Sequence, residues 1–520
     1  MTSAPPHSPS LSTTETPRKA SVRDWVGLAV IALPCLVYSM DMTVLNLALP
    51  AISADLAPSS SQLLWMIDIY GFGVAGFLIT MGTLGDRIGR RKLLMIGAAA
   101  FAIASAIAAF STSAAMLIAM RALLGVAGAT LAPSTLSLIR NIFHDEHERQ
   151  FAIGIWIAAF SMGAAVGPLV GGVLLQFFWW GSVFLAAIPV MALLLVLGPR
   201  LLPEYRDPEA GKLDLASVAL SLVSVLSLVY AFKQMAEQGF EAGLIALAVL
   251  GAGVGWLFVR RQRGLAYPLL DMTLFSQPAF GVAVAVYGLA GLTMFGVYIF
   301  ITQYLQGVLG LSALNAGLAT VPWALGFMGG SLFTGRLTRW MPPTSVLVWG
   351  CALAALGFAL IAVAHGTWAL GVMVAGMVVM SLGMAPVITV INEIIITSAP
   401  PERAGSASAL SETSGEFSGA LGVAIFGSLG MAFYRHSLAE AAPAGLPEAT
   451  LQVSLSTLGG AVSAAHALPG PMGDALLTAA RQSFSHALQL TAAIGAVLLV
   501  VASVVSARVI KRAASRVPAD

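Results

Sequence analysis

Long apolar runs recur along the whole chain and limit its possible folds more than any other feature. Each is about 20 residues long, the length that an α-helix needs to cross the hydrocarbon core of a bilayer. Because these runs are continuous rather than short and alternating, they exclude a transmembrane β-barrel. The sequence therefore predicts an all-α integral membrane protein with fourteen spans. They cover residues 25–49, 62–84, 93–111, 114–138, 150–176, 181–199, 213–234, 241–259, 279–302, 314–335, 344–364, 367–396, 404–434 and 486–508.

The composition of the 520-residue chain excludes the main soluble classes. Hydrophobic residues make up 58% of the chain and charged residues 10%, whereas a soluble domain is nearer half apolar and about a quarter charged. A net charge of +2 provides no strong positive field for a nucleic acid. Cys35 and Cys351 both lie in apolar runs, so they form neither a disulfide framework nor a zinc site. We expect no cofactor, metal or nucleic-acid partner.

The distribution of basic residues predicts the orientation in the membrane. All but four of the 26 Lys and Arg residues fall on one face of the predicted helices. The exceptions are Arg121, inside the fourth span, and Lys233, Arg435 and Arg481, on the opposite face. Cytoplasmic loops are enriched in Lys and Arg, so both termini are predicted to be cytoplasmic. We expect a multi-pass protein of the plasma (inner) membrane, with a bacterium as the expected source.

The spacing of the spans predicts two related halves. Six spans, two extra spans and six further spans match duplicated transporter halves with an inserted hairpin. Residues 436–485 are expected to be an extracytoplasmic hairpin loop in which 447–463 and 473–485 can form short helices; its role in transport stays open. The predicted units are a disordered cytoplasmic tail (1–24), an N-terminal six-helix bundle (25–200), two extra transmembrane helices (201–264), a C-terminal six-helix bundle that includes the loop (265–510) and a cytoplasmic tail (511–520).

The loop after the second span, GTLGDRIGRRK at residues 82–92, has the character of a conformational latch. Gly85 and Gly89 permit a tight turn. Asp86, among Arg87, Arg90 and further bases, can accept a charge-assisted bond from an Arg or cap a helix N-terminus. Such a cluster can hold one conformer closed and release it in another. The alternative is a simple positive anchor on the cytoplasmic side.

Two further patterns lie within spans four and five. Arg121 is an Arg in apolar surroundings, which needs a partner. Gly163 and Gly167 are four residues apart, so they let helices approach closely, and Pro168 introduces a kink. Taken alone, the glycines form an ordinary packing motif.

With these motifs the sequence resembles the major facilitator superfamily. Residues 82–92 match its cytoplasmic signature, Arg121 to Ala129 its fourth-helix signature, and Gly163 to Gly172 its fifth-helix antiporter signature. Residues 40–50 resemble the first-helix signature of the fourteen-helix drug:proton antiporters. The resemblance implies the major facilitator fold of two six-helix bundles plus two inserted helices, a gating role for Gly163, Gly167 and Pro168, and use of a proton gradient. Because residues 335–339 lack the Asp of the cytoplasmic signature, we expect an asymmetric latch.

Intramembrane carboxylates are the candidate coupling groups. Asp41 and Arg121 lie at similar depths and can meet or compete for a shared partner; a static ion pair is the alternative. Glu412 and Glu416 are four apart and share a helix face. These two acids need protons, an Arg from elsewhere or a cationic substrate, and the alternative is hydrogen bonding to neighbouring helices. They resemble part of the acidic cluster of quaternary-ammonium efflux pumps, with Ser411 in place of a third acid.

Asp68 and several aromatic residues complete the predicted site. Asp68 lies between Trp65 and Tyr70 and either binds substrate and protons or bonds a neighbouring helix; Trp323 is a further aromatic candidate. Glu393 is expected to snorkel or cap a helix end. There is no nucleotide-binding Gly-x-x-x-x-Gly-Lys run and no paired His within a span, so we expect no enzyme activity.

The prediction is a monomeric, proton-coupled multidrug efflux antiporter that works by alternating access. Its expected substrates are lipophilic cations: quaternary ammonium antiseptics, dyes and biguanides. The alternative is an exporter of a neutral or anionic antibiotic or metabolite with the same fold.

Overall fold

The computed structural model describes residues 19–58, 60–206, 213–238, 241–276, 278–311, 313–400, 403–443, 445–468 and 470–514. These residues are almost entirely helical. The α-helices are α1 (Val22–Leu56), α2 (Ser60–Ile88), α3 (Arg90–Ala109), α4 (Ala114–Ile142), α5 (Glu146–Phe177), α6 (Ser182–Leu185), α7 (Ala187–Leu201), α8 (Leu215–Gln238), α9 (Ala242–Gln262), α10 (Pro278–Gln303), α11 (Ala313–Trp340), α12 (Pro343–Ala362), α13 (Ala369–Ser398), α14 (Ala404–Ala441), α15 (Glu448–Ser456), α16 (Leu458–Ala467) and α17 (Gly470–Ala514). Three short helices are η1 (Met272–Ser276), η2 (Tyr304–Val308) and η3 (Gly366–Trp368).

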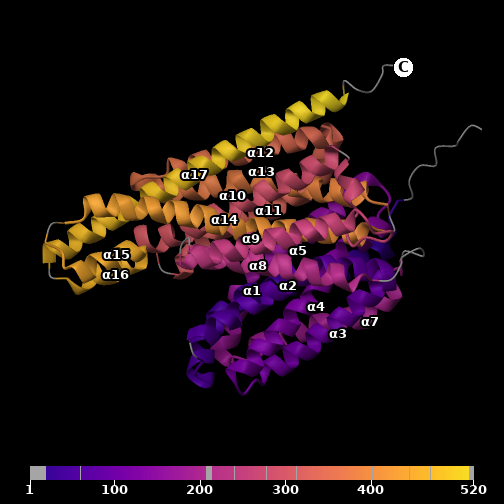
Figure 1. The fold of residues 1–520 in the computed structure, drawn as a ribbon, viewed down its shortest axis with the longest axis horizontal. Coiled ribbons are helices and arrows are strands. Elements are labelled where there is room, and N and C mark those ends of the chain that lie inside the picture. The colour runs from indigo at the N-terminus through magenta and orange to yellow at the C-terminus, as the bar shows by residue number, and fades with distance from the viewer. Residues whose placement is uncertain are drawn as a thin grey trace, which may run out of the picture.

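The prediction of fourteen spans is confirmed. In the described part of the chain, 14 helical stretches are long and apolar enough to cross a membrane, and each overlaps one predicted run. The spans pack into two bundles (Figure 1). In the first, α1 packs on α5, and α4 packs on α2 and α3; in the second, α10 packs on α14, and α12 packs on α13 and α17. The bundles meet where α2 contacts α14 and where α5 contacts α11.

The inserted hairpin, α8 and α9, covers one of these two seams. Helix α8 packs against both α2 and α14, and Phe232 of α8 meets Phe417 of α14 with ring centroids 5.5 Å apart. Helix α9 packs on the outer side of α8 and is mostly exposed, as expected for a helix that faces lipid. The insertion is therefore part of the boundary of the central region and not a separate appendage.

The segment over 436–485 differs from the predicted loop. Helices α14 and α17 extend well past the apolar runs, and α15 and α16 lie between them, opposite the C-terminal end of the molecule (Figure 1). The hydroxyl of Tyr434 donates to the carbonyl of Ser454 at 3.0 Å, and Leu458 and Ala461 are buried. Because these short helices bury their apolar face on the extended ones, the segment folds as a helical cap. Its predicted helix at 473–485 is the start of α17.

The first span also begins earlier than predicted. Ser21 and Asp24 form a capping box in which each side chain bonds the backbone of the other, and α1 starts at Val22. The predicted boundary at residue 24 is therefore wrong by three residues, because this cap extends the helix beyond its apolar run. Residues 1–18 and 515–520 of the predicted tails lie outside the described residues.

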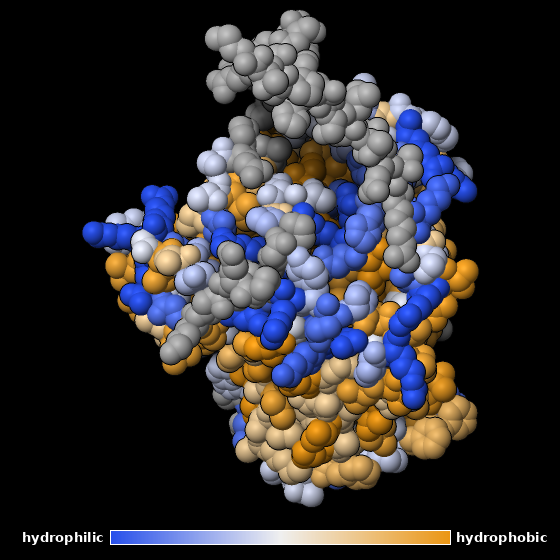
Figure 2. All heavy atoms as spheres, turned by 90° about the vertical axis from the view of Figure 1, so that its right-hand side faces the viewer, coloured by the Kyte–Doolittle hydropathy of each residue, from blue (hydrophilic) through white to orange (hydrophobic). Residues whose placement is uncertain are grey.

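Polar loops converge at one end of the molecule, which we call the basic end. It is defined by residues 86–92, 140–149, 199–206 and 260–271. Contacts between these loops include the bond from the Arg91 guanidinium to the Leu202 carbonyl, at 3.0 Å, and that from Arg87 to the Tyr267 carbonyl, at 3.4 Å. Viewed from the side on which the C-terminus lies, hydrophilic side chains gather on this face (Figure 2).

Candidate functional site

Asp41 and Arg121 meet in a buried ion pair. Nη1 of Arg121 lies 2.5 Å from Oδ2 of Asp41, and the two residues are 1% and 5% exposed. Nε of Arg121 donates to the carbonyl of Met66 at 3.1 Å, and its guanidinium lies 4.7 Å from the ring centre of Tyr70. Since a buried guanidinium without a partner is very costly, this carboxylate, carbonyl and aromatic ring together explain how Arg121 is tolerated at this depth.

The glycines of span five set the position of the helix that carries Asp41. A Cβ added at Gly163 would collide with the backbone of Leu36, and one at Gly167 would collide with Thr43 and press on Met40. Helix α5 therefore contacts α1 directly on both sides of Asp41. Close backbone approach is the usual use of such glycines between membrane helices. The side chain of Pro168 lies outside the described part of the structure.

Glu412 and Glu416 lie between the two bundles. Both are half-buried. Within the described part of the chain, neither carboxylate has a hydrogen-bond or ion-pair partner. Both acids interact electrostatically with Tyr38 of α1 and Tyr287 of α10. The pair thus lies close to the Tyr287 ring, which packs against Gly415, and both acids are partly exposed.

The neighbouring Ser411 has a structural role. Its hydroxyl donates to Oδ1 of Asn392 on α13 at 3.0 Å. This polar contact fixes α14 against α13, and so sets the face from which Glu412 and Glu416 project.

Asp68 bonds the inserted hairpin. Its Oδ1 lies 2.6 Å from Nζ of Lys233 on α8, and both side chains remain partly exposed. The ammonium also lies 5.0 Å from the ring centre of Phe72. The sequence predicts that Asp68 either binds substrate and protons or bonds a neighbouring helix, and in the structure it bonds a neighbouring helix. Lys233 lies near the end of α8 remote from the basic loops, as predicted, and its side chain points into the boundary between α8 and α2.

The predicted aromatic residues are in different surroundings. Trp65 stacks on Tyr230 of α8, with ring centroids 6.4 Å apart, and is 39% exposed. Tyr70 is 1% exposed and packs under Arg121, so in this conformer it supports the ion pair instead of facing a substrate. Trp323 belongs to a separate cluster on α10 and α11, 5.5 Å from Tyr298, and its indole N–H has no partner among the described residues.

The predicted latch at residues 82–92 closes the basic end between the bundles. Asp86 accepts the backbone N–H groups of Gly405 and Ser406, at 3.0 and 2.8 Å, in the first turn of α14. It also accepts a 2.9 Å bond from Nε of Arg90, which is fully buried. The carboxylate therefore caps a helix of the other bundle, where the positive end of the helix dipole favours a negative charge.

The structure explains why two positions of this loop are occupied by glycine. Gly89 has a φ of 110° and precedes α3, a conformation that other L-residues rarely adopt. A Cβ added at Gly85 would lie only 3.2 Å from the side chain of Leu93, so the space there is tight. Arg87, the remaining predicted gating residue, reaches the 260–271 loop through the Tyr267 carbonyl.

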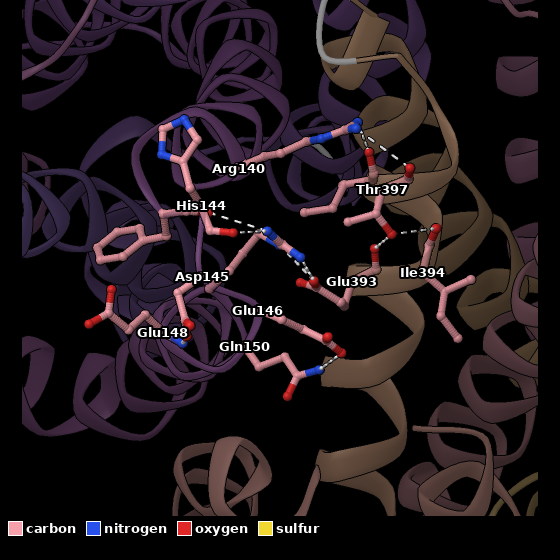
Figure 3. A network of polar contacts seen from close by, with 12 residues as sticks. Arg140, His144, Asp145, Glu146, Glu148, Gln150, Glu393, Ile394 and Thr397 are labelled. Atoms are coloured by element: carbon pink, nitrogen blue, oxygen red, sulfur yellow. Dashed lines mark hydrogen bonds and ion pairs between the residues drawn. The ribbon is translucent and has the colours of Figure 1, made fainter. Parts of the chain in front are cut away.

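A second contact between the bundles lies beside the first but uses other residues. Arg149 of α5 pairs with Glu393 of α13, with Nη2 at 2.5 Å from Oε1, and Arg140 donates to the carbonyls of Ile396 and Thr397 (Figure 3). The expectation that Glu393 snorkels or caps is wrong, because the residue is buried and paired. The latch is asymmetric, as expected, since the matching loop at residues 335–339 has no acid, and its Thr338 donates to Gln150 and to the carbonyls of Thr334 and Gly335.

Sequence reasoning missed Lys233 as the partner of Asp68 and Arg149 as the partner of Glu393. A lone Lys near the end of a span is too common to identify. Arg149 and Glu393 are 244 residues apart, so their pairing depends on the packing of α5 against α13.

Comparison with known proteins now identifies the family. The model of the Major Facilitator Superfamily matches residues 31–423. The chain belongs to the major facilitator superfamily. It is therefore a multi-pass membrane transporter and not an enzyme, and the resemblance in the sequence motifs is confirmed.

Two bacterial relatives match over nearly their whole length. The multidrug efflux pump LfrA of Mycolicibacterium smegmatis is 44% identical over 95% of this chain and 97% of its own. The methyl viologen resistance protein SmvA of Salmonella typhimurium is 36% identical over 92% and 97%. These relatives agree with a location in the bacterial inner membrane.

Two solved structures are similar to this chain in fold, and the similarity supports the fold alone. The human organic anion transporter MFSD10 (TETRAN) superposes with a TM-score of 0.58, at 16% identity, over 92% of this chain and 99% of its own. A bacterial homologue of the human lysosomal transporter Spinster, in an inward-facing conformation, gives a TM-score of 0.55 at 19% identity over 94% and 99%.

Proposed function

We propose that this protein is a proton-coupled drug efflux pump whose substrates are lipophilic cations. The observation that carries the proposal is the pair Glu412 and Glu416, half-buried between the bundles without a hydrogen bond or ion pair in the described chain. A carboxylate at membrane depth is costly unless it binds a proton or a cation. Two acids on one helix face are suited to binding protons and a cation in turn.

The aromatic surroundings support a cationic substrate. The ring of Tyr287 packs against Gly415, one residue before Glu416, and Trp65 of α2 stacks on Tyr230 of α8. Aromatic faces attract weakly hydrated cations. The efflux relative LfrA and the methyl viologen resistance protein SmvA support export of such compounds. We expect quaternary ammonium antiseptics, cationic dyes and biguanides to be exported.

Asp41 is proposed to couple protons to the movement of α1. When Asp41 is ionised, its pair with Arg121 ties α1 to α4. When it takes a proton, the guanidinium loses its counter-ion and keeps only the Met66 carbonyl and the Tyr70 ring. Because α1 also contacts α5 at Gly163 and Gly167, a change in this pair is transmitted to the helix that faces the second bundle.

In the proposed cycle, the basic end faces the cytoplasm and the conformer described here is closed on that side. The polar contacts that join the bundles, Asp86 with α14 and Arg149 with Glu393, lie at this end. When they separate, a cation enters from the cytoplasmic side and displaces protons from Glu412, Glu416 or Asp41. After the contacts re-form, protons return to the acids and the drug leaves. One charge crossing 100 mV is worth about 2.3 kcal/mol, so one or more protons per cycle drive export.

The test is drug-induced proton movement in inverted membrane vesicles. Once respiration has acidified the lumen and quenched a pH-gradient dye, adding ethidium should partly restore fluorescence. Asp41→Asn should abolish that response for every substrate, whereas Glu416→Gln should impair cations more than neutral drugs. A response to neutral or anionic antibiotics, with none to cations, would favour the exporter of neutral or anionic compounds. An unchanged response in Asp41→Asn would remove this residue from coupling.

A further inference from the structure

Lys233 lies next to the proposed binding region. The residue projects from α8, which packs on both α2 and α14. Its ammonium is 2.6 Å from Asp68 of α2 and 5.0 Å from the ring centre of Phe72, and it also interacts electrostatically with Glu416 of α14. A carboxylate, an aromatic face and a second nearby acid are the groups that we expect a lipophilic cation to use. The Lys233 ammonium thus already occupies the kind of surroundings that a cationic substrate needs.

The inserted hairpin holds this ammonium in place. Tyr230 stacks with Trp65 and Phe232 meets Phe417, so aromatic contacts fix α8 on either side of the boundary between α2 and α14. The side chain of Lys233 is 34% exposed and that of Asp68 is 20% exposed. The ion pair is therefore partly accessible, while its backbone is anchored.

We propose that Lys233 is a built-in counter-ion that makes this transporter select singly charged over doubly charged cations. The proposal rests on the proposed function, since it concerns the choice among cationic substrates. With Lys233 present, one acid is already neutralised and a fixed positive charge faces the second. A monocation can bind at the remaining acids, whereas the additional charge of a dication is repelled by the ammonium, and Asp68 is not free to balance it.

The size of the effect follows from Coulomb's law. One additional unit charge held about 7 Å from a fixed ammonium, at an effective dielectric constant of about 20, is disfavoured on the order of 50-fold. Removing the ammonium should therefore change affinity for a dication far more than for a monocation. A structural role alone would weaken both ligands together.

The experiment measures equilibrium binding of tetraphenylphosphonium, a monocation, and methyl viologen, a dication, to the full-length protein in lipid nanodiscs. Lys233→Gln should raise the affinity for methyl viologen relative to tetraphenylphosphonium at least tenfold, and Lys233→Met should do the same. Lys233→Arg keeps the charge and should keep the wild-type ratio. Arg261→Gln is the matched control, because it removes a positive charge, paired with Asp214, from the same hairpin.

A ratio in Lys233→Gln within twofold of the wild type overturns the proposal, as does an equal change in Arg261→Gln. Should Lys233→Gln fold poorly, Asp68→Asn provides an independent arm: it leaves the ammonium without its partner and should weaken methyl viologen more than tetraphenylphosphonium. Equal weakening of methyl viologen and tetraphenylphosphonium binding in Asp68→Asn also contradicts the proposed role of Lys233. If wild type binds tetraphenylphosphonium and the ratios do not move, only this inference fails. If no variant binds either cation, the proposed function fails with it.

Discussion

Asp86→Asn tests whether one carboxylate closes the basic end of the molecule. Asp86 accepts two backbone N–H groups from α14 across the boundary between the bundles, at 3.0 and 2.8 Å. Its bond to Arg90 is made within one bundle, so this bond persists when the bundles separate. Of the bonds that Asp86 makes, only the two with α14 therefore bias the equilibrium between closed and open conformers.

The expected shift follows from these two hydrogen bonds. A hydrogen bond to a charged group contributes about 1.5–3 kcal/mol, and the amide oxygen of Asn can still accept one of the two. The loss is then about 3 kcal/mol, and since 1.4 kcal/mol corresponds to a factor of ten, the closed conformer should lose population relative to the open one on the order of 100-fold.

Distances between spin labels measured by double electron–electron resonance report this change directly. Labels on Lys92→Cys and Arg339→Cys, both exposed at the basic end on different bundles, are introduced after the buried Cys35 and Cys351 are replaced by Ala. Asp86→Asn should transfer most of the short-distance population to longer distances. A distribution identical to that of the parent would refute the reasoning.

Asp271→Asn is the charge-matched control for this measurement. Burial raises the pKa of Asp271, but hydrogen bonds from Thr273 and the ion pair with Arg403 outweigh it and leave the pKa below its usual value. The residue is therefore ionised at neutral pH. Since Asp271 and Arg403 flank helices of the same bundle, its loss should leave the label distances unchanged.

Three further predictions follow from individual contacts. Gly163→Val should abolish transport while the protein still inserts, because the new side chain collides with the backbone of α1; wild-type efflux of ethidium from cells would contradict this. Glu393→Gln leaves Arg149 beside a neutral partner, and breaking a buried pair costs about 3–5 kcal/mol; the same label pair should report opening at least as large as in Asp86→Asn, and no change would contradict a latch. Tyr434→Phe removes one hydrogen bond between α14 and the helical cap and should lower stability by about 1 kcal/mol, measured by thermal unfolding, with efflux unchanged.

The fold was largely predictable because the bilayer imposes a simple length rule on apolar segments. The meeting of Asp41 and Arg121 could also be anticipated, since equal depth in two spans is countable from sequence. The helical cap was not, because its short helices bury only residues such as Leu458 and carry too weak an apolar signal. The contact of Arg149 with Glu393 depends on how two distant helices pack.

Lys233 illustrates the limit most clearly. A Lys near the end of an apolar run is usually assigned to the water interface, where its long side chain can snorkel. Its actual partner, Asp68, is decided by the side on which the inserted hairpin docks. The sequence of the hairpin alone contains no information on that choice, so the pairing appeared only with the packing of α8 on α2 and α14.

The position of α8 has a consequence for how a membrane-dissolved compound reaches the acids. The two seams between the halves are unequal: one is covered by the inserted hairpin, and the other, between α5 and α11, has no such cover in the described chain. A molecule arriving sideways from the lipid toward Glu416 at the covered seam must part the rings of Phe232 and Phe417. Sideways access at the two seams is therefore closed in different ways: by the rings of α8 and α14 at one seam, and by the contact of Gly154 with Ser331 between α5 and α11 at the other.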